Sequence, residues 1–417
     1  MHSYYSSGRF SQHLLWLAAL AGVVGLLASR ALIALSPVAG VLAVLANPRL
    51  LQGLGTYLRT GAALRAAALV AFLLLSGLYT SEWAVWRHEL FRSLTWLGVP
   101  LAFTAAVPLT RAQRLTVGSL FVGGTALVGV ATLGQYLLDP AAANQAIGIG
   151  QNMPAITRVF HISFGTMLAQ SFFWALLLRQ QVRHTAGRAA LVGAALAAVV
   201  VLHVLAYRTG LLVFYVGLLV YALRLLLRRH VALGLGLLLL LALGPWAAYH
   251  TLESVRQRVA ASIWDVQQYQ LDRDINQYSL ARRLAAVETA TVLVRQHPWL
   301  GVGPADAYAA MMDQYRWKNF GLRPENWVNV HNQYLSTLVG GGVVGLALWL
   351  ALLLWPLAHP ATRRNPYIGF FILTQATGMM VTDILSLQIS LNLFVFQYGF
   401  LVVAAETRRR QHLKPAP

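Results

Sequence analysis

Apolar residues occur along most of this chain in long runs that are separated by short polar segments. Twelve runs are long enough to cross a bilayer as helices, and they are centred near residues 20, 38, 72, 99, 126, 169, 197, 219, 240, 346, 374 and 395. Hydrophobic residues make up 58% of the 417 positions and charged residues only 11%, which is outside the range of soluble domains. We therefore expect an all-α polytopic membrane protein with about twelve transmembrane helices.

One long segment of mixed polarity, residues 250–330, separates the ninth apolar run from the tenth. Apolar residues at spacings of three and four predict an amphipathic helix that ends before Pro298. This stripe consists of Leu280, Leu284, Val287, Thr291 and Val294. A turn from Gly301 to Pro304 then opens a second helix. We expect spans in 1–249, a helical loop domain in 250–330, spans in 331–405 and a basic tail in 406–417.

Basic side chains predict the orientation of the chain. The formal net charge is +19, and basic residues cluster at both ends and in alternate connections, at 49–65, 111–114, 179–188, 224–229 and 363–364. Of the 13 acidic residues only Glu406 falls on that side, so the positive-inside rule predicts cytoplasmic termini and an external 250–330 loop. Because topology accounts for the charge, no nucleic-acid partner is expected. The absence of cysteine excludes disulfides and thiolate sites.

His331 lies where the mixed segment ends and the tenth apolar run begins, in Val330-His331-Asn332-Gln333-Tyr334-Leu335. The first N–H groups of a helix have no partner within it, and this positive end disfavours a charged imidazole. A neutral histidine that acts as a general base is therefore one interpretation. The alternative is an interfacial histidine that only caps its helix.

Several arginines fall on the predicted outer side, where the positive-inside rule gives no reason for them. They are Arg158, Arg208, Arg282 and Arg283. A guanidinium binds phosphate oxygens through two parallel N–H groups and keeps its charge, so these residues together favour a lipid pyrophosphate site. Their charge would stabilise a departing phosphate oxygen without a metal, while His331 deprotonates an acceptor hydroxyl. Each arginine alone would equally reach lipid headgroups by snorkelling.

Other polar residues offer competing interpretations. Asp272-Arg273-Asp274 has the form of a divalent-metal site, although solvated charges explain it as well. Glu82 and Glu89 form an acidic pair in a tryptophan-rich loop that suits the membrane interface. His297 precedes Pro298 and is expected to end a helix. Polar residues inside the apolar runs would line a translocation path, and none has metal-site spacing: His161, His203, Asp383 and Asn392.

Three motifs in this order resemble the O-antigen ligase and polymerase superfamily. They are Arg208-Thr209-Gly210 at the head of a span, Arg283 fifteen residues before the proline of His297-Pro298-Trp299-Leu300-Gly301-Val302-Gly303, and His331-Asn332-Gln333-Tyr334-Leu335 at the start of the next span. Arg158 before Phe160 and His161 is similar to a further family position. The chain departs from the family pattern at Val287, where a tryptophan is common, and in the doublet Arg282-Arg283.

The resemblance implies an enzyme of the bacterial inner membrane that transfers a glycan from undecaprenyl pyrophosphate at the periplasmic face. In the ligase branch the acceptor is a sugar hydroxyl of lipid A–core, and the reaction needs neither metal nor cofactor. Arg208 and Arg283 would then hold the pyrophosphate, with Arg282 and Arg158 as further candidates, and His331 would be the catalytic base. Membrane lipids are the other expected partners.

Three alternatives remain at this point. An O-antigen polymerase or a protein O-oligosaccharyltransferase would use the same site with another acceptor. A transporter that binds an anion at its helix ends is a different class, and internal repeats in the two halves of the sequence would favour it.

Overall fold

The computed structural model describes residues 2–148 and 151–413, and in these ranges the chain forms helices, turns and bends without any β-strand. The all-α prediction is therefore confirmed for this part of the chain. In the first half the helices are α1 (His2–Ser6), α2 (Arg9–Ala28), α3 (Arg30–Leu45), α4 (Leu50–Tyr57), α5 (Gly61–Ser76), α6 (Trp83–Ser93), α7 (Thr95–Ala105), α8 (Arg111–Leu138), α9 (Pro140–Gly148), α10 (His161–Arg179) and α11 (Thr185–Val204).

The second half contains the remaining helices, one 3-10 turn, η1 (Pro324–Asn326), and one π-helical segment, η2 (Tyr398–Val403). The helices are α12 (Arg208–Leu227), α13 (Val231–Thr251), α14 (Glu253–Gln270), α15 (Ser279–Gln296), α16 (Ala307–Trp317), α17 (Gln333–Ala358), α18 (Pro366–Met379), α19 (Gln388–Gln397) and α20 (Ala404–Leu413). Residues 414–417 of the predicted basic tail lie outside the described residues.

Eight described helices are long and apolar enough to cross a membrane, and the bent pair α4 and α5 would make a ninth. Each of the twelve predicted centres falls inside a helix. However, α3, α7 and α18 have only 16, 11 and 14 residues, which is short for a hydrocarbon core of about 30 Å. The chain is thus an all-helical polytopic membrane protein, and the number of twelve spans stays a prediction.

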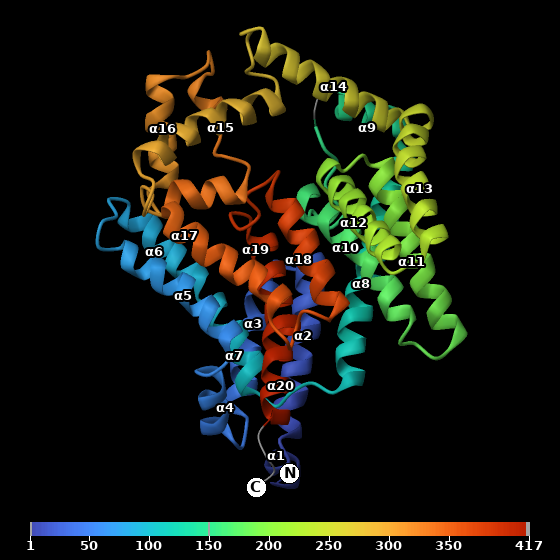
Figure 1. Cartoon of the computed structure of the whole chain (residues 1–417), viewed down its shortest axis with the longest axis vertical. Helices are drawn as coiled ribbons and strands as arrows, with labels where there is room; N and C mark the ends of the chain where they lie inside the picture. Colours follow the sequence, from blue (N-terminus) through green and yellow to red (C-terminus); the bar gives the residue numbers. More distant parts are fainter. Residues whose placement is uncertain (1, 149–150, 414–417) are drawn as a thin grey trace.

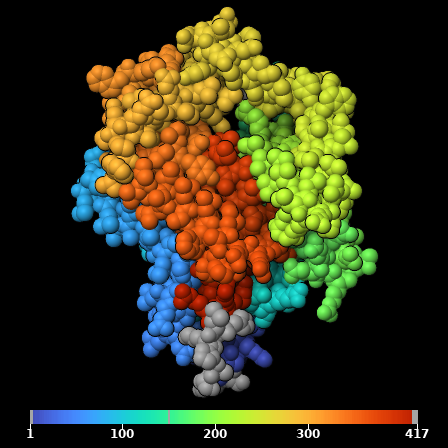
Figure 2. All heavy atoms as spheres, viewed as in Figure 1, coloured from blue at the N-terminus to red at the C-terminus, as the bar shows by residue number. Residues whose placement is uncertain are grey.

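The helices form a bundle whose two ends differ (Figure 1). One end is covered by α14, α15, α16 and η1, here called the helical cap, residues 253–330. The space-filling view shows this cap extending over the apolar helices (Figure 2). Both chain ends, α4 and α20 lie at the opposite end of the molecule. The helical character predicted for residues 250–330 is confirmed, whereas the helix α9 had no counterpart in the prediction.

The buried face of α15 differs from the predicted one. The helix ends at Gln296, before Pro298, as predicted, but Val287 of the expected stripe is 41% exposed. Most of the buried residues of α15 are alanines, namely Ala281, Ala285, Ala286 and Ala290, together with Thr289 and Leu293. They cluster with Met311 and Tyr315 of α16. The prediction was wrong because it weighted large apolar residues, while small side chains let helices approach closely.

The turn that follows α15 pairs its backbone with α17. The N–H groups of Val302 and Gly303 donate to the carbonyls of Val339 and Gly340, at 2.9 and 3.1 Å. In the opposite direction, the N–H of Val343 donates to Pro298 O at 2.8 Å. These groups are free because α17 is broken at Gly342, whose φ of 58° and ψ of −160° are not helical. The turn therefore satisfies backbone groups that the break would leave unpaired in a buried position.

Glycine is required on both sides of this pairing. Gly301 has a φ of +66°, and a Cβ atom there would lie 2.4 Å from Val339 O. At Gly342 a Cβ atom would lie 2.3 Å from the carbonyl carbon of Trp299. The close helix packing predicted at Gly341 and Gly345 is also found, since both residues face the ring of Phe72 in α5. The sequence reading did not anticipate that the same glycine run breaks the helix.

Gly301→Ala and Gly342→Ala should each destabilise the protein by about 3 kcal/mol, because left-handed φ angles and backbone overlap both penalise a side chain. The midpoint of thermal unfolding in detergent would measure the effect. Gly123→Ala is the matched control, since nothing lies within 4 Å of its Cβ position and its backbone is helical. Equal midpoints for Gly301→Ala, Gly342→Ala and the control would contradict the pairing.

Asp306 joins the helical cap to the start of α6. Its Oδ2 accepts from Thr80 Oγ1 at 2.6 Å, and its Oδ1 accepts from the hydroxyl and N–H of Ser81, at 2.6 and 2.8 Å, and from Glu82 N. Burial by itself would raise the pKa of this carboxyl, but the hydrogen bonds from Ser81 and Thr80 outweigh it and lower the pKa. The contact therefore stabilises the fold only while the carboxyl is ionised.

Asp306→Asn should lower stability by about 2 kcal/mol at neutral pH, the typical value of hydrogen bonds to a charged group. The folded-state pKa lies below the unfolded value of about 3.9, so this stabilisation is complete above that pH and is lost as the pH falls through the folded-state pKa. Thermal unfolding of both proteins between pH 7 and pH 3 would test it, with the exposed Glu325→Gln as control. A difference that does not shrink in acid would contradict the assignment.

Candidate functional site

The motif His331-Asn332-Gln333-Tyr334 attaches the start of α17 to the end of α18 and the chain that follows it. Asn332 is the N-cap of α17, since its Oδ1 accepts from Leu335 N at 3.0 Å. Its amide also donates to Met380 O at 2.9 Å. The cap is therefore Asn332 and not His331, because an extended backbone at position 332 lets a short side chain reach the third helical N–H. The interpretation of His331 as a mere cap was wrong.

Residues 380–387, which we call the 380–387 connection, link α18 to α19 and hold several polar groups. Gln333 Oε1 accepts from Leu385 N at 3.0 Å. Arg92 of α6 donates to Leu385 O at 2.8 Å and pairs with Glu89 at 2.6 Å. The connection is not helical over most of its length, so its own backbone groups are available for these contacts.

His331 pairs with Asp383 of this connection. The His331 Nδ1 and Asp383 Oδ1 atoms are 3.3 Å apart, and the Asp383 side chain is buried. A proton on Nδ1 facing the carboxylate leaves the Nε2 lone pair available, and no described residue donates a hydrogen bond to it. An imidazole oriented by a carboxylate in this way is the arrangement of a general base, because the carboxylate stabilises the imidazolium formed. The sequence had suggested Asp383 only for a translocation path.

Arg283 approaches the same connection from α15. Its Nη1 donates a long hydrogen bond of 3.4 Å to Val381 O. Burial lowers the pKa of Arg283, the charge of Arg208 lowers it further, and Asp383 opposes this by raising it. Arg208 and Asp383 are therefore both within electrostatic range of Arg283. Asp383 is in turn the partner of His331.

Arg208 is the first residue of α12, two residues after Ala206, whose φ is +48°. Its Nη1 donates to Ser262 Oγ of α14 at 3.2 Å. Asp265, one turn further along α14, is the acidic group within its electrostatic range. Asp265 accepts from Leu280 N at 2.7 Å, close to the start of α15. The helical cap therefore contributes directly to the surroundings of Arg208.

Arg258 of α14 is a third member of the cluster, which the sequence reasoning missed. It is only 3% exposed, and its Nη2 donates to Gln151 O at 2.5 Å and to Asn152 Oδ1 at 2.9 Å. Burial, with a further contribution from the positive charge of Arg208, lowers the pKa of Arg258 to about 10. Its Nε and Nη1 have no acceptor among the described residues. One feature of the sequence could have identified Arg258: Ser262 and Asp265 follow it by four and seven residues, which places three polar side chains on one face of a helix.

We call Arg208, Arg258 and Arg283 the arginine cluster. His161, the first residue of α10, lies within electrostatic range of all three guanidinium groups. Its ring is tilted by 35° relative to that of Tyr207, with centroids 6.4 Å apart. Helices α10, α12, α14 and α15 therefore meet at one place, although they come from distant parts of the sequence.

The other predicted arginines lie differently. Arg282 donates to Asn326 Oδ1 at 3.0 Å, next to η1, so in the doublet Arg283 is the residue that joins the cluster. Arg158 is exposed, with a φ of +60°, and its side chain has no hydrogen-bond or ion-pair partner among the described residues. These positions give Arg282 a structural contact and do not bring Arg158 into the arginine cluster.

The competing polar residues have local partners. Asp274 Oδ1 accepts from Asn276 N at 2.9 Å, which forms a turn, and His297 is the C-cap of α15, as predicted. His203 contacts Val199 O and Tyr215 Oη, and Asn392 donates to Gln388 O. In the parts of the chain that the structure describes, no three His, Cys, Asp or Glu side chains form a group that could hold a metal.

Asp383 also lines a cavity of about 360 Å³ between α5, α6, α16 and α17. Its polar lining includes Glu89, Arg92, Asn329 and Gln333, while Trp96 and Tyr308 contribute aromatic rings. None of the residues of the arginine cluster lines this cavity. The buried carboxylate of Asp383 therefore lines this cavity and is also within electrostatic range of Arg283.

Asn332→Ala should lower stability by about 1 kcal/mol through loss of the cap, and it should also lower any activity that requires His331 near Asp383. The matched control is Asn365→Ala, which removes the side-chain cap of α18 through the bond to Tyr367 N. Thermal unfolding and turnover would be measured for both variants. Similar losses of stability with equal turnover would contradict a positioning role for Asn332.

Comparison with known proteins identifies a family that part of this chain resembles. Residues 182–350 match the family model described as O-Antigen ligase, and this segment contains the arginine cluster and His331. A search of curated proteins found no match. Over residues 182–350 the chain is therefore similar to the O-antigen ligase family, which supports transfer of glycans by a membrane protein.

Proposed function

We propose that this protein is an O-antigen ligase that transfers a glycan from undecaprenyl pyrophosphate to a sugar hydroxyl of lipid A–core. The reaction takes place at the periplasmic face of the bacterial inner membrane, under the helical cap. The observation that carries the proposal is that Arg283 contacts the 380–387 connection, whose Asp383 pairs with His331, and is also within electrostatic range of Arg208. The similarity of residues 182–350 to the O-antigen ligase family supports transfer between a lipid-linked glycan and a lipid acceptor in general.

The arginine cluster is suited to a pyrophosphate. Arg208 lies within electrostatic range of both Arg258 and Arg283, and an anion with several oxygens relieves the repulsion between these like charges. The Nε and Nη1 groups of Arg258 are buried without an acceptor, which costs free energy unless an anion offsets it. Within the cluster, Arg208 belongs to α12 and Arg283 to α15. Fixed positive charge here stabilises the leaving pyrophosphate.

The His331–Asp383 pair supplies the base. The acceptor hydroxyl gives its proton to His331 Nε2, and its oxygen attacks the anomeric carbon of the donor sugar. The bond from that carbon to the pyrophosphate oxygen breaks, and its electron pair leaves with undecaprenyl pyrophosphate. Asp383 holds the ring at 3.3 Å and stabilises the positive charge that the ring acquires.

The acceptor sugar would enter through the cavity beside Asp383. This cavity of about 360 Å³ combines aromatic rings with carboxylate, amide and guanidinium groups, a lining that suits a carbohydrate. Asp383, the partner of His331, lines this cavity, whereas no residue of the arginine cluster does. Donor and acceptor can therefore bind at the same time, which a direct transfer requires.

Purified protein incubated with lipid-linked glycan and lipid A–core in EDTA should form the conjugate. His331→Gln should lower turnover by about a thousandfold, the scale of general base catalysis, and should retain donor binding. Arg258→Gln and Arg283→Gln should weaken donor binding at least about tenfold, because each removes a charged phosphate contact. Gel analysis of the product and a direct binding assay with the donor would separate the two effects.

The control is Arg295→Gln, an exposed arginine at the end of α15 without a described partner, which should behave as wild type. Full turnover of His331→Gln, or donor affinity unchanged in both cluster variants, would contradict the proposed roles. Omitting lipid A–core tests the acceptor. A product that still grows by joining two lipid-linked glycans would instead identify a polymerase, and transfer to a protein would identify an oligosaccharyltransferase.

A further inference from the structure

A second cationic region lies at the end of the molecule opposite the helical cap, where α4, α20 and both chain ends are found (Figure 1). A cavity of about 730 Å³ opens there between α4, the chain that follows α17, and α20. Arg59, Arg409 and Arg410 line it together with the hydroxyl of Thr56 and the amide of Gln52. These arginines come from opposite ends of the sequence, and neither the family match nor the proposed transfer reaction accounts for them.

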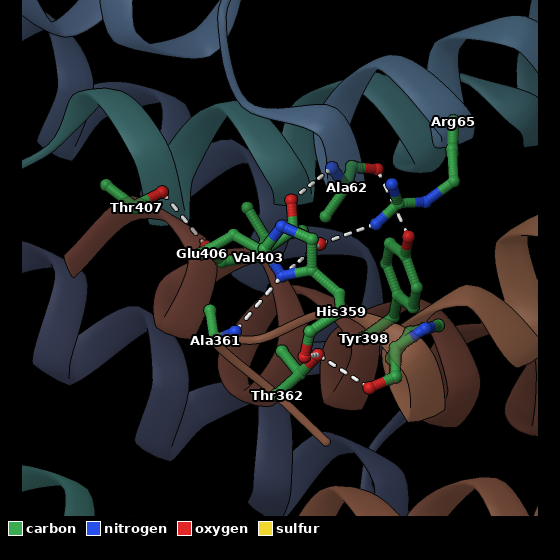
Figure 3. Close-up of polar contacts among 10 residues, drawn as sticks. Ala62, Arg65, His359, Ala361, Thr362, Tyr398, Val403, Glu406 and Thr407 are labelled. Atoms are coloured by element: carbon green, nitrogen blue, oxygen red, sulfur yellow. Dashed lines mark hydrogen bonds and ion pairs between the residues drawn. The ribbon is translucent and has the colours of Figure 1, made fainter. Parts of the chain in front are cut away.

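The positive charge of this cavity is not neutralised within the described protein. Glu406, the acidic residue in its lining, has both carboxylate oxygens engaged (Figure 3). Arg65 Nη2 donates to Oε1 at 2.5 Å, and Ala62 N donates to Oε2 at 2.8 Å. The carboxylate is buried, and its charge is matched by Arg65. Among the described residues, Arg59, Arg409 and Arg410 have no acidic or hydrogen-bonding partner, so the cavity retains an excess of positive charge.

Helix α4 makes the region amphipathic. Gln52, Thr56 and Arg59 recur at spacings of four and three and line the cavity. Leu51, which also lines the cavity, Leu54 and the C-cap residue Leu58 recur at spacings of three and four, and they are 83%, 36% and 66% exposed. Helix α4 is bent by 69° from α5, so it does not continue the direction of that helix. A short helix with these two faces is suited to the boundary between headgroups and acyl chains.

We propose that this cavity binds the phosphate-bearing headgroup of an anionic phospholipid, whose acyl chains lie against the exposed leucines of α4. The guanidinium groups of Arg59, Arg409 and Arg410 contact the phosphate oxygens, and the side-chain amide of Gln52 donates a further hydrogen bond. A free phosphate ion would satisfy the same charges but would leave the leucine stripe without a partner. The combination of a cationic cavity with an apolar stripe therefore favours an amphiphile.

Native mass spectrometry of the full-length protein, titrated with cardiolipin, phosphatidylglycerol or phosphatidylcholine of equal acyl chains, tests this binding without any transfer reaction. Wild type should bind the anionic lipids more tightly than phosphatidylcholine. The triple variant Arg59→Gln, Arg409→Gln, Arg410→Gln should lose up to about a hundredfold in affinity for cardiolipin, and each single variant about fivefold. If the triple variant aggregates, the affinities of the three single variants for cardiolipin are compared with that of wild type instead.

The matched control removes the same charge elsewhere, through Arg183→Gln, Arg188→Gln and Arg228→Gln, which are exposed and have no described side-chain partner. This control should keep the affinity for cardiolipin. Equal losses in both triple variants would show that general electrostatic attraction suffices, and they would overturn the site. Displacement of bound cardiolipin by inorganic phosphate alone would also overturn it, because the headgroup would then bind without help from the leucine stripe.

Discussion

The arginine cluster holds guanidinium groups of like charge near one another, and the structure must offset the free-energy cost of their repulsion. The charge of Arg208 lowers the pKa of both Arg258 and Arg283, and burial together with this charge lowers the pKa of Arg258 to about 10. Groups of like charge remain together in a poorly solvated place only when surrounding structure holds them there and partners compensate part of the charge. Asp265 and Asp383 provide part of this compensation, each beside a different arginine. The unpaired N–H groups of Arg258 leave a demand that an anionic ligand can meet.

The required rigidity comes from contacts between backbone segments more than from the site side chains. The turn at residues 298–303 pairs with the broken α17, so α15, which carries Arg283, has a fixed position relative to the first turn of α17. Hydrogen bonds from Asn332 and to Gln333 then attach the start of α17 to the 380–387 connection. The histidine, its carboxylate and one arginine are therefore attached to the same small framework. Within the motif that begins at His331, the polar residues Asn332 and Gln333 thus serve mainly to hold the His331 imidazole in place.

The sequence predicted what depends on local pattern. Apolar runs became helices, Pro298 ended α15, and the His331 motif began α17, because composition and helix termini are encoded within a few residues. It did not predict contacts that depend on tertiary packing. Arg258 looked like any charged residue of a polar helix, and Asp383 lies 52 residues beyond its partner His331, measured along the chain. The glycine run of α17 predicted close packing and also produced a helix break, and alanines rather than leucines form the buried face of α15.

The position of a bound donor is the most direct measure of this account. A cryo-electron microscopy map of the protein with undecaprenyl pyrophosphate, or a non-reactive glycan derivative of it, would locate the two phosphates. The account predicts that their oxygens lie within hydrogen-bond distance of Arg208, Arg258 and Arg283, with the first sugar facing His331 Nε2. Phosphates found away from all three guanidinium groups, or at the end of the molecule that carries α4 and α20, would contradict it.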